Sequence, residues 1–547
     1  MKQVPHDLRE RNRSRFSSHI GWVVAAAAAM IALVVLLSNE RQYGLALNSV
    51  KLAAATCAIS LPLGTILAVL LLRSDLPGRV AWLLLCGSLM LIPLYLQCAG
   101  WRAGFGEQGW WTLAQNDVSA GPLIDNWRGA IWVHAMSAVP WVVIMVGASL
   151  LWVSPALEEA TLLDAAAWRV VLHVTLRNAL PGMLAASLWI VVNTAGEITA
   201  TDLFRVRTLA EDLYQGYYLG QSSLEAEWSL LPALALFILS AIAAWKLCDW
   251  LVPVNWEVPH RAPRVIHLGK WRWLATAITL CVLLLIVGIP IASLIYKAGV
   301  DVVQTDIARL RTWSFAKCLK TIASAIGLPN PMRWEYAWDF AWSGTITSLA
   351  AFCSLSLAVV LAWLAKILPG TRWMFVAVMA ICLSLPGPLI GQTIVWLRGA
   401  SDAAAYVWLF DQTIFAPCVA LTIRGLPWCA LIMWHAFQSL PTAMWDASRV
   451  DGARIWRSLL WVALPQRRAA LVVAWFIALA VGLGDVSAVM LTIPPGVDML
   501  SIRIFGLLHY GVEDKVAGIC LALISLYLLS VCAAAHIVTR RSEGPFL

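Results

Sequence analysis

Long apolar stretches separated by short polar breaks run along almost the whole chain. Each stretch is close to the roughly 20 residues that a helix needs to cross a bilayer. The pattern predicts twelve membrane-spanning helices, at residues 20–38, 46–72, 80–98, 129–153, 179–200, 228–251, 274–296, 341–365, 373–397, 414–438, 469–493 and 516–538. We therefore expect an all-α polytopic membrane protein.

The composition supports this expectation and narrows the possible functions. Of the 547 residues, 61% are hydrophobic and 13% are charged, whereas a soluble chain carries about 25% charged residues. A dozen spans leave no room for a large soluble catalytic domain, which excludes most soluble enzymes. The 12 cysteines form no Cys-x-x-Cys pair or Cys/His cluster, so we expect no metal or other cofactor in this chain.

The basic residues indicate an orientation in the membrane. If the N-terminus is cytoplasmic, the inside segments collect 23 of the 39 Lys and Arg residues but 11 of the 31 Asp and Glu residues. Cytoplasmic loops are enriched in Lys and Arg, so both termini are expected in the cytoplasm. The net charge of +8 then reflects topology, and no clustered basic face suggests nucleic-acid binding.

Several short segments recur about 287 residues apart. Residues 159–166 match 446–453 at an offset of 287, and residues 196–199 match 484–487 at an offset of 288. The repeat predicts two homologous six-helix halves, residues 1–252 and 274–547, joined by a cytoplasmic linker at 253–273. An even number of spans in each half makes the halves parallel, with a pathway expected between them.

The clearest recurring motif lies between the fourth and fifth spans of each half. In loop 439–468 it reads Asp446-Ala447-Ser448-x-x-Asp451-Gly452-Ala453, followed by Val462-Ala463-Leu464-Pro465. A glycine there permits a turn, and the proline is expected to start the next span, where a missing N–H is tolerated. This motif resembles the EAA loop of importer-type ABC permeases, and the duplicated layout extends the resemblance over nearly the whole chain.

The copy in loop 154–181 departs from that pattern. It contains Glu159, Ala160, Asp164, Ala165 and Ala166, so alanine replaces the glycine. One residue is missing, and Arg177 stands near the place of the proline. Either the two halves couple unequally, or the first copy is a tolerated variant in which Leu180-Pro181 begins the span later.

The resemblance implies partners for both faces of the membrane. In a type I ABC importer such loops form coupling helices on two copies of a cytoplasmic ATPase subunit, which binds ATP and Mg²⁺. A periplasmic binding protein would meet the outer segments 99–128, 201–227, 297–340 and 494–515, of which 297–340 includes a predicted helix from Val302 to Ile326. The expected location is the bacterial inner membrane. The coupling residues would be Glu159, Ala160, Asp164, Ala165, Ala166, Asp446, Ala447, Asp451, Gly452, Ala453, Leu464 and Pro465.

The chain itself contains no phosphate-binding loop. Its one Gly-Lys pair, Gly269-Lys270, is followed by Trp271, and the segment from Gly387 to Thr393 has Gln392 where the lysine would be required. The ATPase must therefore be a separate chain, and we expect this chain to be a transport subunit with no enzymatic activity.

Three ionisable residues inside or at the ends of spans are candidates for the pathway or its gate. Glu197 and Asp485 occupy equivalent places after a glycine, and they could alternatively mark solvated helix ends. Arg424 lies about ten residues into its helix. It could face an anionic substrate or pair with Asp485. His134 and His435 are interpreted as packing residues.

The substrate is less well defined by the sequence. The layout most resembles the iron(III) and thiamine branches of duplicated permeases, with iron(III) slightly favoured and a polyamine or phosphonate as further alternatives. An ion-coupled secondary transporter is the competing class, because it also often has twelve helices in two parallel halves.

Overall fold

The computed structural model describes residues 40–114, 121–218, 264–304, 309–328 and 334–542. Almost all of this part of the chain is helical, apart from a hairpin that pairs β1 (Val300–Gln304) with β2 (Arg309–Trp313). Within these described residues, five helical segments are long and apolar enough to cross a membrane, and the number rises to nine if four bent helix pairs each form one span. The predicted all-α polytopic fold is confirmed. The spans predicted at 20–38 and 228–251, and most of the linker, lie outside the described residues.

The same order of helices occurs twice along the chain. The first series is α2 (Glu40–Arg73), α3 (Arg79–Met90), α4 (Leu94–Phe105), α5 (Trp110–Ala114), α6 (Asn126–Leu151), α7 (Pro155–Leu162), α8 (Ala167–Val170), η1 (Val171–Thr175), α9 (Leu176–Asn178), α10 (Leu180–Gly196), α11 (Thr199–Leu203) and α12 (Leu209–Tyr218). The second series is α17 (Ala337–Ile367), η5 (Pro369–Thr371), α18 (Arg372–Ser384), α19 (Gly387–Arg398), α20 (Ala404–Asp411), α21 (Phe415–Gln438), α22 (Thr442–Val450), α23 (Ile455–Ser458), η6 (Leu459–Ala463), α24 (Leu464–Gln466), α25 (Arg468–Gly484), α26 (Leu500–Tyr510) and α27 (Asp514–Ser542).

The bends recur as well as the helices. The chain turns by 99° between α3 and α4 and by 102° between α18 and α19, and by 58° and 82° before α10 and α25. Pro93 and Pro386 stand at the first pair of bends with nearly identical extended backbones, φ −58°, ψ 149° and φ −62°, ψ 144°. Proline lacks an N–H and disfavours helix in the residue before it, which explains why the predicted spans 80–98 and 373–397 are each broken in two.

A long helical segment before the second series packs against the first. This segment, Gly269–Gly299, comprises η2 (Gly269–Trp271), α14 (Arg272–Leu283), η3 (Leu284–Gly288) and α15 (Ile289–Gly299). Its α15 part contacts α4 and also α27. In each half the helices at the second, fourth and fifth predicted spans pack together, as α2, α6 and α10 and as α17, α21 and α25. The largest hydrophobic core therefore includes residues from both series.

The segment 297–340 differs from its prediction. The helix expected from Val302 to Ile326 begins only at α16 (Phe315–Ala325), and the residues before it form the β1–β2 hairpin. Three β-branched valines within Val300–Gln304 favour a strand. Ser314 then starts the helix, because its side chain accepts a hydrogen bond from the Lys317 amide at 3.4 Å.

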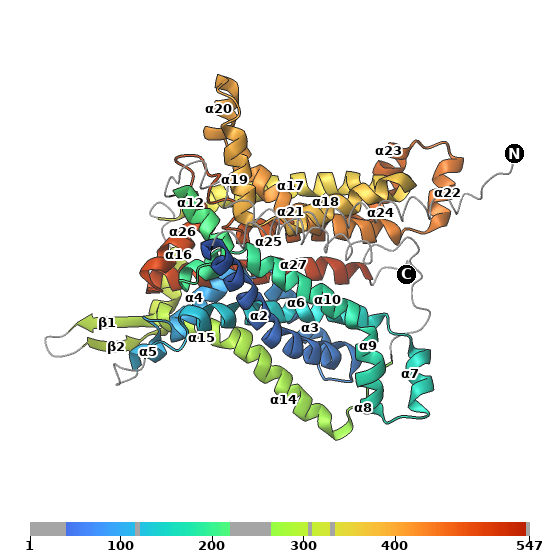
Figure 1. The fold of residues 1–547 in the computed structure, drawn as a ribbon, viewed down its shortest axis with the longest axis horizontal. Helices are drawn as coiled ribbons and strands as arrows, with labels where there is room; N and C mark the ends of the chain where they lie inside the picture. Colours follow the sequence, from blue (N-terminus) through green and yellow to red (C-terminus); the bar gives the residue numbers. More distant parts are fainter. Residues whose placement is uncertain (1–39, 115–120, 219–263, 305–308, 329–333, 543–547) are drawn as a thin grey trace.

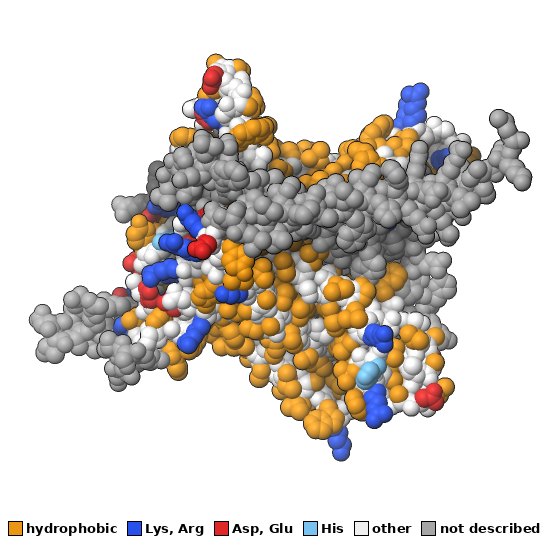
Figure 2. Space-filling model, viewed as in Figure 1, with side chains coloured by type: hydrophobic (Ala, Val, Ile, Leu, Met, Phe, Trp, Pro, Cys, Tyr) orange, Lys and Arg blue, Asp and Glu red, His pale blue; other side chains and the backbone are white. Residues whose placement is uncertain are grey.

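The elements gather at two opposite ends of the molecule. Figure 1 shows α7 and α8 together with α22 and α23 at one end, while the hairpin, α5, α12 and α16 lie toward the other. We call these the loop end and the hairpin end. In Figure 2 hydrophobic side chains predominate on the described surface between the two ends, and most charged ones lie toward the ends, as expected for a surface that meets lipid between two aqueous layers.

Candidate docking loops and translocation cavity

The second motif copy forms a short helix closed by a glycine turn. After α22, Gly452 adopts φ +72°, in the left-handed region. Its amide donates to the Arg449 carbonyl and the Ala453 amide donates to the Ser448 carbonyl, both at 3.0 Å. This is the Schellman pattern of helix ends, in which glycine avoids the steric cost of a Cβ atom. The motif glycine is therefore required by backbone geometry.

The first copy ends without such a turn. After α7 the Ala165 amide donates to the Thr161 carbonyl at 3.0 Å, which continues a single helical turn. Positive φ among the described non-glycine residues is confined to Asn126 and Arg205, so Ala165 needs no left-handed backbone. The first copy is one residue shorter than the second and has Ala165 where the second has its glycine. These two differences agree, because the shorter loop makes no glycine turn and so has no position that needs glycine.

The predicted coupling residues form two exposed surfaces at the loop end. Glu159, Ala160, Asp164, Ala166, Asp446, Ala447, Asp451, Gly452 and Pro465 are exposed, while Ala165, Ala453 and Leu464 are half-buried. Pro465 does not begin the next span, contrary to the prediction. It lies in α24, between the π turn η6 and the bend before α25, and in the first half Pro181 stands in the first turn of α10 itself.

Each loop is anchored by a basic residue at the end of a long helix. The Arg73 guanidinium donates to the Leu150 carbonyl at 2.8 Å, and the Lys366 ammonium donates to the equivalent carbonyl, that of Phe437. Cations are favoured at helix C-termini, where carbonyl groups lack partners. The sequence pattern did not single out this pair, although both are basic residues that close an apolar run.

The remaining contacts of the two anchors differ in chemistry. Arg73 forms an ion pair with Glu158, and both side chains are almost fully buried, at 1% and 2% exposure. The Thr175 hydroxyl donates to the other Glu158 oxygen at 2.5 Å, so α7 is tied to α2 and to η1. In the second half Trp445 occupies the equivalent position and packs against Trp363, with ring centroids 5.2 Å apart. The first loop is thus held by charge and the second by aromatic packing.

A cavity of about 370 Å³ lies between the two series of helices. Its lining comes from α3, α4, α6 and α10 of the first series and from α18, α21 and α25 of the second. All three predicted pathway residues, Glu197, Asp485 and Arg424, line it. The structure therefore brings together residues that are as far as 288 positions apart in the chain.

Arg424 and Asp485 form an ion pair at the cavity wall. Arg424 Nε lies 2.6 Å from Asp485 Oδ2, and the exposed fractions of the two side chains are 28% and 4%. The other Asp485 oxygen accepts a hydrogen bond from the Ala488 amide at 2.8 Å. The carboxylate is thus fully engaged, while part of the guanidinium remains accessible from the cavity.

Glu197 has a related role in the first half. Its carboxylate accepts hydrogen bonds from the Thr199 amide at 2.7 Å and the Ala200 amide at 3.0 Å, so it caps the start of α11. His134 Nε2 lies 3.8 Å from Glu197 Oε2. His134 is almost fully buried, in keeping with its interpretation as a packing residue, and no sequence spacing would reveal Glu197 as its neighbour.

Three tryptophans meet on the cavity wall. Ring centroids lie 4.8 Å apart for Trp141 and Trp189, 5.0 Å for Trp141 and Trp428, and 5.2 Å for Trp189 and Trp428. Trp141 and Trp428 are equivalent in the repeat, and the contacts of Trp428 with Trp141 and with Trp189 both join the two halves directly. Along α10, Trp189 lies about two turns closer to the loop end than Glu197, so the three indoles form an apolar part of the cavity wall on the loop side of that carboxylate.

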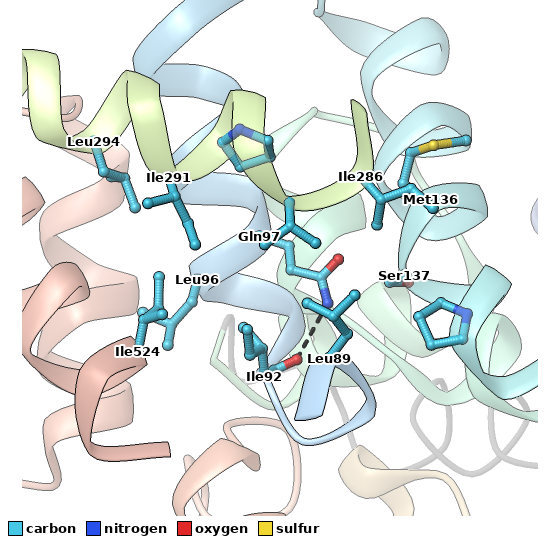
Figure 3. Close-up of a pocket in the computed structure, with 13 residues that line it drawn as sticks. Leu89, Ile92, Leu96, Gln97, Met136, Ser137, Ile286, Ile291, Leu294 and Ile524 are labelled. Carbon is cyan, nitrogen blue, oxygen red and sulfur yellow. Dashed lines mark hydrogen bonds between the residues drawn. The ribbon is translucent and has the colours of Figure 1, made fainter. Parts of the chain in front are cut away.

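A second, much smaller pocket adjoins this cavity. Figure 3 shows that it is lined mainly by apolar side chains, which come from α3, α4, α6, η3, α15 and α27. Its volume is about 30 Å³. Gln97, which lines both pockets, donates to the Ile92 carbonyl at 3.2 Å. This pocket is too small and too apolar to hold a polar solute.

The arrangement suits passage of a solute better than covalent chemistry. Among the described residues no group of three His, Cys, Asp or Glu side chains is placed to hold a metal ion. The main cavity combines a partly accessible guanidinium with neutral hydrogen-bonding side chains, Gln97, Ser137, Asn193 and Ser487. Such groups can replace part of the hydration shell of a solute and release it again.

Comparison with known proteins identifies related membrane subunits. No protein-family model matches the chain. The molybdenum transport system permease protein ModB of Escherichia coli K12 is 26% identical over 230 residues, which cover 40% of this chain and 97% of that protein. ModB of Haemophilus influenzae is 33% identical over 162 residues, which cover 28% of this chain and 69% of that protein.

The names of these relatives match the predicted class of transporter subunit. Each is a permease, and each is shorter than this chain, since almost the whole E. coli protein matches less than half of it. The chain therefore belongs to the family of ABC importer permeases that includes the ModB proteins.

Proposed function

We propose that this chain is a fused permease in which both halves of an ABC importer pathway are built from one polypeptide. The observation that carries the proposal is the presence of two exposed motif loops at one end of the molecule, each followed by a bend and a span. Two ATPase subunits would dock there from the cytoplasm, and a binding protein would deliver solute at the hairpin end. Both termini would be cytoplasmic.

Each loop is connected to the cavity by a run of short helical segments, a bend and one longer helix. From η6 the chain passes through α24 and the 82° bend into α25, whose 17 residues end beside Asp485. At 1.5 Å per residue α25 is about 25 Å long, so a shift of the loop is transmitted to the opposite end of the cavity. The first half has the same connection from η1 through α10 to Glu197. Closure of the ATPase subunits would thereby switch the cavity between its two openings.

For the substrate we propose a small oxyanion. The named relatives transport molybdenum, which in neutral water is the molybdate dianion. None of these names supports iron(III), thiamine, a polyamine or a phosphonate. The accessible part of the Arg424 guanidinium can donate to such an anion, and its pairing with Asp485 weakens the attraction enough for the anion to leave.

Reconstitution into vesicles with and without an ATPase subunit of the same transporter tests this function. We expect uptake of radiolabelled molybdate only with the ATPase, ATP and the binding protein present. Gly452→Asp should abolish uptake by disrupting the glycine turn, while Gly344→Ala, at an open and exposed helix position, should not change it. Uptake driven by an ion gradient with no ATPase present would instead establish the secondary-transporter alternative.

A further inference from the structure

Two reciprocal glycine–proline contacts join the halves at the edge of the cavity. Gly484, the last residue of α25, lies against Pro93 at the bend between α3 and α4. Gly196, the last residue of α10, lies against Pro386 at the bend between α18 and α19. Each half thus seats the end of one span on the bend of the other half, and the two contacts are equivalent in the repeat.

The contacts leave so little room at the glycines that a side chain there would push the facing proline away by a few tenths of an ångström. A Cβ atom on Gly484 would lie 3.0 Å from Pro93 Cγ and 3.3 Å from its Cβ. A Cβ atom on Gly196 would lie 3.1 Å from Pro386 Cα and 3.3 Å from its Cβ. Neither glycine has a positive φ, so the close approach of the proline is what favours glycine here. Tyr95 adds a contact between the halves, since its hydroxyl donates to the Leu483 carbonyl at 3.4 Å.

The residue after each glycine is one of the cavity carboxylates. Asp485 pairs with Arg424 and caps the turn at Ala488, and Glu197 caps α11. A displacement of either glycine therefore moves a carboxylate, its hydrogen-bonded turn and one wall of the cavity together. Motion at the contact and motion of the charged groups are mechanically linked.

We infer that the two glycine–proline contacts hold the cavity shut at the hairpin end, and that Gly196 and Gly484 are positioning residues for Glu197 and Asp485. This inference rests on the proposed function, because it concerns the gate of the same cavity. Opening toward the hairpin end separates the halves at these contacts. An added methyl group forces them apart and so favours the open arrangement.

The two contacts predict different outcomes for compensating changes. Pro93→Ala removes Cγ, the atom nearest to a new Cβ on Gly484, and so makes room for Gly484→Ala. Pro386→Ala leaves the backbone Cα, which is the nearest atom to a new Cβ on Gly196. The proline substitution should therefore restore the wild-type contact in Gly484→Ala/Pro93→Ala but not in Gly196→Ala/Pro386→Ala. General destabilisation would not produce this difference between the two double variants.

Hydrogen–deuterium exchange of the chain alone in nanodiscs tests the contact without any ATPase. We expect Gly484→Ala to accelerate exchange several-fold in residues 483–490, Pro93→Ala to reverse that change, and Gly196→Ala to remain unreversed by Pro386→Ala. Gly344→Ala and Gly506→Ala are matched controls, because a Cβ at either position meets nothing within 4 Å. Unchanged exchange in Gly484→Ala, or failure of Pro93→Ala to restore it, overturns the inference.

The assembled transporter supplies a second readout. With the ATPase subunits bound, Gly484→Ala should raise ATP hydrolysis in the absence of the binding protein, and Gly484→Ala/Pro93→Ala should return it to the wild-type level. Faster exchange with unchanged hydrolysis would refute the gating role. If no ATPase subunit couples to the wild-type chain, the proposed function fails while the exchange result still decides the contact.

Discussion

The buried ion pair beneath the first loop offers the sharpest test of how that loop is held. Glu158→Ala removes a carboxylate that is 2% exposed and leaves the Arg73 guanidinium, 1% exposed, with the Leu150 carbonyl. Removing one member of a buried pair costs about 3–5 kcal/mol. Since 1.4 kcal/mol is a factor of about ten, local opening of α7 should become roughly a hundred to a few thousand times more populated.

Exchange of the α7 amides measures this opening directly. Glu158→Ala should remove most protection from residues 154–165, up to the rate of an unprotected amide. The double variant Arg73→Met/Glu158→Leu should recover protection, because no charge is then left buried. As a control, Trp445→Ala at the equivalent position should affect only loop 439–468. Equal protection in wild type and Glu158→Ala would show that the ion pair does not hold α7.

Three further predictions concern the other loop, the cavity and the hairpin end. Gly452→Ala places a Cβ atom at φ +72°, which costs about 1–2 kcal/mol. In a pull-down, this variant should retain less ATPase subunit than the wild-type chain does, whereas Ala165→Gly should not retain more. Arg424→Leu leaves the Asp485 carboxylate buried without its cation and should lower the unfolding temperature. The double variant Arg424→Leu/Asp485→Leu should restore the unfolding temperature but not molybdate uptake. Restored uptake in the double variant would refute the role of Arg424. Burial raises the pKa of Glu211 from 4.5 to about 7. Its contribution to the stability of the fold is therefore full below pH 4.5 and is lost as the pH rises through about 7. Thermal unfolding of Glu211→Gln, measured across this pH range, should lack this loss of stability.

Spacing along the chain is enough to identify candidate functional residues, several of which the structure brings together. It singles out the motif residues, the two candidate carboxylates and Arg424, and all three charged residues line one cavity. The permease class is confirmed by the relatives, while the twelve-span count, the domain boundaries and the coupling roles stay predictions. The preference for iron(III) found no support, because the relatives are molybdenum transport permeases.

The residues that sequence reasoning missed act through contacts between distant segments. Glu158 reads as one more acid in a polar loop, yet it is buried against Arg73, 85 positions away. Trp141 and Trp428 are recognisable as a repeat match, but their ring contact depends on how the halves face one another. The strand at Val300–Gln304 was missed because a short apolar run can form either a strand or a helix.

The sequence by itself determined that the chain is an all-α membrane protein with a repeated motif, because apolar length, basic loop residues and fixed spacing are local properties of a chain in a bilayer. The tertiary structure decided which charges are paired, where the broken spans turn, and that Gly196 and Gly484 each abut a proline of the opposite half. These features depend on distances between segments that share no sequence relation, and close packing makes each of them sensitive to a single methyl group.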